Sequence, residues 1–198
     1  MARIFGVQSQ DGLSGHLKCT ITGKLPSLGE ITVVGYIGEG ASKSLTSNWE
    51  SPFEGDTVGN AGVLDKASSL TQVYSDRTSK TQLNSRLVWE GVSPPELNMP
   101  LYFHALTNAK LEVEDAIMAL EAMASPELNE LTPGGRVPIT VIVDVGRRLK
   151  LPNVIIRDVS SELDAPRDRS GYMIRNTVQL TCSMNGMVNQ SDIPKLYV

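Results

Sequence analysis

The sequence feature that most constrains the fold is one strongly helical run, residues 110–124, in a chain otherwise rich in strand and turn formers. The run holds no glycine or proline, and alanine, leucine, methionine and glutamate fill most of it. Val113, Ile117, Leu120 and Ala124 recur at spacings of four, three and four residues, which places them on one helix face. An amphipathic helix of this kind most simply covers an open flank of a sheet. The alternative is a helix that binds a partner.

Both ends of this helix carry boundary signals. Thr107 and Asn108 offer side-chain oxygens to the first unpaired backbone amides. Glu112 lies near the N-terminal end, where the helix dipole favours negative charge. Ser125 and Pro126 end the helix, because a residue before proline avoids the α region.

The remaining apolar segments have the two-residue period of strands. Residues 17–24 and 30–37 alternate or are rich in β-branched residues, and the short turn between them predicts a hairpin. Residues 172–184 alternate over their whole length, which predicts a strand with one buried and one wet face. The side chains expected on the buried face are Ile174, Asn176, Val178, Leu180 and Cys182. Further strands are predicted near residues 83–90, 101–106, 137–145 and 154–159.

Residues 41–86 form the polar part of the chain, and they are too long for a passive loop in a compact domain. They predict a long hairpin arm, or a segment that becomes ordered against a neighbour. Trp49 and Phe53 are its early apolar residues. Either they anchor an interface, since buried aromatics dominate binding hot spots, or they hold the arm to its own core.

Composition excludes several classes. The 18 basic and 22 acidic residues leave a net charge of -4, which argues against a dedicated nucleic-acid binder. No apolar run is long enough to span a membrane, and the N-terminus lacks the apolar region of a secretory signal, so we expect synthesis and folding in the cytoplasm. Cys19 and Cys182 are expected as buried free thiols, with a disulfide as the alternative. His16 and His104 have no zinc-ligand spacing around them.

Two acidic pairs are the only residues that could suggest catalysis. Glu112 with Asp115, and Asp164 with Asp168, could act as carboxylate pairs. Helix-start charge and loop solubility explain both pairs equally well, and carboxylates without a cleft are not a site. We therefore expect no enzyme activity, no cofactor and no bound metal.

Several stretches together resemble the tail-tube and baseplate proteins of contractile phage tails. They are residues 47–54, the Trp89-Glu90-Gly91 run followed by Pro94, residues 111–126, residues 154–156, and residues 171–174 with the long strand that ends at Met184. Each stretch is short, and their order along the chain carries the resemblance. The chain departs from some baseplate relatives in having no peptidoglycan-binding LysM segment.

The resemblance implies a mainly β (α+β) fold. One domain, residues 1–198, would hold two packed antiparallel sheets as a tail-tube-like sandwich or barrel, with one flanking helix and residues 41–86 as an arm or insertion. It also implies a structural virion protein that forms or braces a homohexameric ring of the tube at the baseplate. Its partners would be copies of itself, neighbouring tube and baseplate proteins, and DNA that passes through without specific binding. Assembly would take place in the host cytoplasm, and no membrane partner is expected.

The candidate subunit interface is Trp49, Phe53 and Trp89. A second class is a β-sandwich module that binds carbohydrate or a host surface. That class should show clustered exposed aromatic side chains, whereas here the five Tyr, three Phe and two Trp are scattered along the sequence.

Overall fold

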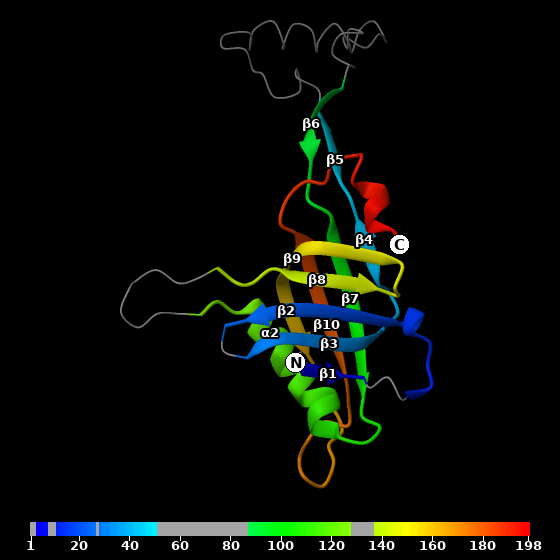
Figure 1. Cartoon of the computed structure of the whole chain (residues 1–198), viewed down its shortest axis with the longest axis vertical. Coiled ribbons are helices and arrows are strands. Elements are labelled where there is room, and N and C mark those ends of the chain that lie inside the picture. Colours follow the sequence, from blue (N-terminus) through cyan, green and yellow to red (C-terminus); the bar gives the residue numbers. More distant parts are fainter. Residues whose placement is uncertain (1–2, 8–10, 27, 51–86, 128–136) are drawn as a thin grey trace, which may run out of the picture. The chain divides into compact units, whose positions relative to one another are not determined.

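The computed structural model describes residues 3–7, 11–26, 28–50, 87–127 and 137–198 (Figure 1). The chain divides into two compact units. We call Met1–Leu45 with Pro94–Val198 the body, and Thr46–Ser93 the arm. Trp49 and Trp89 belong to the arm, whereas the predicted helix belongs to the body. Phe53 lies outside the described residues.

The body contains one eight-stranded sheet, in the order β1-β3-β2-β8-β9-β10-β7-β4. Its strands are β1 (Arg3–Gly6), β2 (Lys18–Leu25), β3 (Gly29–Ile37), β4 (Ser42–Ser44), β7 (Glu96–His104), β8 (Val141–Val145), β9 (Leu149–Ser161) and β10 (Arg175–Met184). The other strands follow the predicted order of a hairpin, then the arm, a strand, the helix and three more strands, but the short strands β1 and β4 were not predicted.

Six of these strands close into an antiparallel barrel, because β3 pairs with β7 as well as with β2. The closing seam is short: Tyr36 pairs with Tyr102, and Ile37 with Leu101. Away from the seam, β1 runs parallel to the first part of β3, and β4 runs antiparallel to the first part of β7. The barrel is thus closed where β3 meets β7, and the short strands β1 and β4 extend the sheet beyond that seam.

Strand β9 forms a corner of the barrel. Its first part pairs with β8 and its second part, from Val154 onward, pairs with β10. Between them, Asn153 has a φ of 53°, a left-handed conformation that asparagine tolerates better than most residues. In Figure 1, β2, β3 and β8 run across the view while β7 and β10 run along it. A strand that bends from one direction to the other is how crossed sheets share a corner.

The barrel interior is filled by side chains. Phe103, Leu101, Ile21 and Leu180 are fully buried. A side chain at Gly35 would place its Cβ 3.0 Å from the Phe103 ring, so glycine there leaves room for that ring. A barrel this small holds a packed core.

The predicted helix begins with a π-helical turn, η3 (Lys110–Glu114), and continues as α2 (Asp115–Ala124). It lies against β1, β2, β3 and β9, and its inner face is completely apolar apart from Glu112. The buried residues of that face are Val113, Ala116, Ile117, Ala119, Leu120 and Met123. Ser125 is extended, as its position before proline predicts.

The structure confirms a mainly β protein with one α-helix in the part of the chain that it describes. It differs from two separate packed sheets, because the β3–β7 seam joins the strands into one barrel. The predicted alternation is confirmed from Arg175 to Met184, where Asn176, Val178, Leu180 and Cys182 are buried. It is wrong for residues 172–174, because β10 begins only at Arg175, and there Met173 is buried while Ile174 is only partly buried. Strand β7 starts at Glu96, earlier than predicted, because β10 offers partners along its full length.

Candidate subunit-interface site

The arm contains a two-stranded antiparallel sheet, β5 (Ser47–Glu50) with β6 (Val88–Val92). Trp49 and Trp89 are direct cross-strand partners. The register shifts between Asn48 and Trp49, so one strand is bulged next to the tryptophan pair. Gly91 has a φ of 148° there, a conformation that residues with a side chain rarely adopt.

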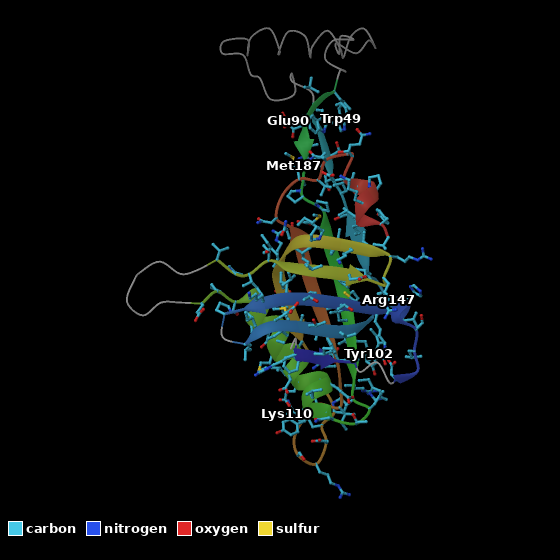
Figure 2. All side chains as sticks on the ribbon, in the orientation of Figure 1. Trp49, Glu90, Tyr102, Lys110, Arg147 and Met187 are labelled. Atoms are coloured by element: carbon cyan, nitrogen blue, oxygen red, sulfur yellow. The ribbon has the colours of Figure 1, made fainter. Side chains whose placement is uncertain are left out.

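The two tryptophans share one face of this hairpin. Trp49 is 53% exposed and Trp89 is 51% exposed. The indole Nε1 of Trp89 donates a hydrogen bond of 3.1 Å to Oγ of Ser47, which fixes the ring across the strands. We call Ser47, Trp49 and Trp89 the tryptophan face. Figure 2 marks Trp49 on β5 and Glu90 on β6.

An exposed aromatic pair on a two-stranded sheet is unusual for a protein that acts alone. Such a sheet is marginally stable in water without a further layer. Tryptophan is also the side chain most enriched at binding hot spots. Of the three interface residues predicted from sequence, the structure places Trp49 opposite Trp89, and both are about half exposed. Phe53 lies outside the described residues, and the interface stays a prediction.

The body carries an apolar hollow under its C-terminal segment. Residues 185–198, which we call the C-terminal strap, are held at both ends: Asn185 N donates to Asn153 O, and Val198 N donates to Arg148 O. The hollow next to the strap has a volume of about 450 Å³, and we call it the strap hollow. It is lined by Ile142, Lys150, Pro152, Met184, Met187, Val188, Asn189, Asp192, Lys195, Leu196 and Val198. Met187, labelled in Figure 2, is 68% exposed.

A buried polar cluster lies at the barrel seam, and sequence analysis missed it. Lys18 Nζ and Tyr36 OH donate to the two carboxylate oxygens of Asp11, at 2.7 and 2.5 Å. Burial alone would raise the pKa of Asp11, but the hydrogen bonds from Lys18, Tyr36 and the Leu13 backbone, with the Lys18 charge, lower it to about 2. Burial and the neighbouring Asp11 raise the pKa of Tyr36. The cluster ties the segment that holds Asp11 to β2 and β3, and no sequence pattern marks it.

Glu112, from the first acidic pair weighed above, binds the residues just before the helix, while Asp115 begins α2. The Glu112 carboxylate accepts hydrogen bonds from the backbone amides of Leu106, Thr107 and Asn108, and from the Thr107 hydroxyl at 2.5 Å. Burial opposes the charge, but these donors outweigh it and lower the pKa of Glu112. The predicted cap is confirmed at Asn108, whose side chain accepts from Leu111 N at 3.3 Å. Glu112 lies four residues after Asn108, one residue further than in a capping box, so that motif does not mark it.

The second acidic pair lies in the loop between β9 and β10. Asp168 accepts hydrogen bonds from the amides of Ser170 and Tyr172, at 2.8 and 2.9 Å, so it shapes a turn. Asp164 lies in another part of this loop, where it lines a hollow together with Arg175 and Tyr102. In the described residues, no group of three or more His, Cys, Asp or Glu side chains is arranged to hold a metal ion.

The two cysteines are free and buried. The expected pair of buried thiols is confirmed, and the alternative disulfide is not formed. Burial raises the pKa of Cys19, and it raises that of Cys182 to about 12.

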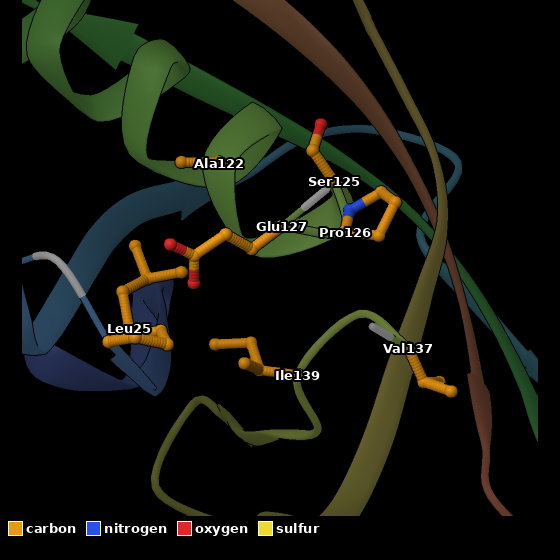
Figure 3. Close-up of a pocket in the computed structure, with 8 residues that line it drawn as sticks. Leu25, Ala122, Ser125, Pro126, Glu127, Val137 and Ile139 are labelled. Carbon is orange, nitrogen blue, oxygen red and sulfur yellow. The ribbon is translucent and has the colours of Figure 1, made fainter. Parts of the chain in front are cut away.

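A second hollow, of about 330 Å³, lies between the end of β2, the C-terminal end of α2 and residues 137–139 (Figure 3). Leu25, Ala122, Pro126 and Ile139 make its walls largely apolar, and Glu127 is its charged residue. It borders residues 128–136, which lie outside the described part of the chain, so no site is assigned to it.

No protein-family model and no curated protein sequence matches the chain. Within the described residues, no helix combines the length and the apolar character needed to cross a membrane. The chain is therefore characterised by its own geometry: a small antiparallel barrel with one helix, and an arm that displays two tryptophans.

Proposed function

We propose that the chain is a structural subunit of a contractile phage tail, which forms or braces a hexameric ring of the tube at the baseplate. The observation that carries the proposal is the exposed Trp49–Trp89 pair on the separate arm. A unit that displays apolar area in this way gains stability by covering it with another chain. The choice of a contractile tail rests on the sequence resemblance described above.

The barrel supports a role in a ring. Strand β4 pairs only with β7 in the described part of the chain, so its second edge can accept a strand from a neighbour. A ring needs two different surfaces that meet from one copy to the next. The arm and the body supply separate surfaces of this kind.

The charge of the chain suits a conduit for DNA. With a net charge of -4, the protein lacks the excess of basic groups that would hold passing phosphates. DNA would move through the lumen without specific binding. Contacts with neighbouring tube and baseplate proteins, and a location in the virion, belong to the same proposal.

Electron microscopy tests this proposal directly. The full chain is expressed with the products of the genes next to its own, and particles are imaged. A six-fold ring at the base of a tube or along it is the expected result. A lone copy on the particle surface, outside any tube, would contradict the proposal.

One observation favours a second candidate, a module that binds carbohydrate or a host surface. The tryptophans that are scattered in sequence meet on one face of the hairpin, and clustered exposed aromatics are what such a module needs. A glycan that quenches or shifts the tryptophan emission of the isolated chain would support this candidate. Absence of any change across a glycan panel, together with ring formation, would exclude it.

A further inference from the structure

The arm carries an apolar face with acidic neighbours. Trp49 and Trp89 are each about half exposed, and Glu50 and Glu90 follow them directly in the sequence. The described arm residues include no basic side chain. A surface that covers this face should therefore be apolar in its centre and basic at its edge.

The strap hollow has both properties. Its lining includes the apolar side chains Ile142, Met184 and Met187, and methionine adapts its shape to an incoming ring. Two lysines, Lys150 and Lys195, are also among the residues that line it. Lys195 is paired with Asp192 at 2.7 Å, whereas no ion pair of Lys150 occurs among the described residues. The volume of about 450 Å³ is within the range of pockets that hold small ligands.

We propose that the tryptophan face of one copy docks into the strap hollow of a second copy of this chain. The indole rings would cover the exposed Met187 and the partly buried Met184, and Glu90, which is unpaired at the bulge beside Trp89, would approach Lys150. Opposite charge at the edge and apolar contact in the centre is the usual anatomy of a specific interface.

This contact joins two different surfaces, so each copy donates an arm and receives one. A contact of this type closes into a ring or grows as a filament. The inference rests on the proposed function and names the pair of surfaces through which the ring would form.

The chain reports on this contact without a label, because its two tryptophans both lie in the arm. Tryptophan emission and sedimentation of the full-length protein are measured over a wide concentration range. As the protein self-associates, the emission maximum should move to shorter wavelength in step with the increase in mass. An emission maximum that does not change with concentration overturns the inference. The indole rings would then either be covered within one chain or remain in water at every concentration.

A matched pair of methionine variants tests the hollow. Met187→Glu places an acid in the hollow that the acidic arm must approach, and it should weaken self-association about tenfold or more. Met118→Glu makes the same change at an exposed position of α2, 46% exposed, and should leave association unchanged. Lys150→Glu, at an exposed position of β9, gives a second variant if Met187→Glu disturbs folding. Equal effects of Met187→Glu and Met118→Glu would overturn the inference.

A mixing experiment distinguishes docking between copies from docking within one chain. The double variant Trp49→Ala/Trp89→Ala has no tryptophan but keeps its hollow, whereas Met187→Glu keeps its tryptophans but has a damaged hollow. Titrating the first into the second should shift the tryptophan emission to shorter wavelength. The tryptophan-free chain that also carries Met187→Glu should give no shift. A shift with both titrants, or with neither, overturns the inference.

Imaging of particles separates a failure of this docking from a failure of the proposed function. If Lys150→Glu and Met187→Glu chains still form six-fold rings in imaged particles, this docking is wrong while the proposed function stands. If the wild-type chain forms no ring in those particles, the proposed function fails whatever the solution data show.

Discussion

Lys18 Nζ lies 2.7 Å from Asp11 Oδ1 in an ion pair that is nearly closed to water, with 9% and 2% of the two side chains exposed. Lys195 and Asp192 form a second ion pair with the same separation, 2.7 Å, but with 75% and 41% of their side chains exposed. Asp11 also accepts hydrogen bonds from the Tyr36 hydroxyl and the Leu13 amide, and Asp192 accepts one from the Asn189 side chain at 3.2 Å. The two pairs therefore separate the effect of burial from that of distance.

Asp11→Asn should destabilise the body by about 1–3 kcal/mol, because the buried ammonium of Lys18 loses its ion pair with the Asp11 carboxylate. The matched change Asp192→Asn should have no measurable effect, since solvent screens an exposed pair. Urea unfolding at neutral pH measures both variants. Equal losses would show that burial of the Asp11 pair has no energetic consequence.

Acid should remove the Asp11 contribution in a defined window. The folded-state pKa of about 2 lies below the ordinary value of 3.8, so the stabilisation is complete above pH 4 and is lost as the pH falls toward 2. In Asp11→Asn the unfolding free energy should therefore fall less steeply between pH 4 and 2 than in the wild type. Identical pH profiles would contradict the role of this carboxylate.

Glu112→Gln should weaken the start of the helix, because an amide nitrogen would face donors that now meet a carboxylate oxygen. The cost should be about 1–3 kcal/mol. The control Glu121→Gln, at an exposed position of α2, should change stability by less than about 0.5 kcal/mol. Thermal unfolding measures the stability of both variants. A large loss of stability in Glu121→Gln alone would refute the role of Glu112 at the helix start.

Trp49→Ala should reduce assembly more than folding. Because the ring is half exposed, the unfolding free energy of the body should change by less than about 0.5 kcal/mol. Val88→Ala serves as the control, since Val88 is also half exposed but pairs with Glu50, next to the tryptophan pair in the register. Ring yield in imaged particles and denaturant unfolding are compared, and equal ring yields for the two variants would count against the interface.

Cys19 and Cys182 should resist thiol reagents in the folded protein. Burial raises the pKa of both thiols, and the thiolate is the reactive form. Ser170→Cys places a third thiol at an exposed position of the β9–β10 loop as a positive control. In native buffer one thiol per chain of that variant should react, and three should react in denaturant. Rapid labelling of the wild-type protein would show that the barrel opens.

Local pattern predicted much of the fold. The helix was located at residues 110–124 because its spacing of apolar residues and its boundary signals depend only on near neighbours. The inward face of β10 followed from alternation, and Leu180 and Cys182 are buried accordingly. The exposure of tryptophan, by contrast, could not be read from sequence, because both the interface and the core-anchoring alternatives use the same residue.

Local sequence patterns were enough to predict the inward face of β10 from Asn176 to Cys182 and the extent of the helix, since covalent geometry sets both periods. Three contacts between distant parts of the chain could be seen only in the folded protein: the closure of the barrel through Tyr36 and Tyr102, the ion pair of Asp11 with Lys18, and the pairing of Trp49 with Trp89. The last pair is separated by a long polar segment, and a one-residue bulge sets its register. Such pairings depend on the packing of the whole chain, where a shift of one residue would send every side chain of a strand to the other face.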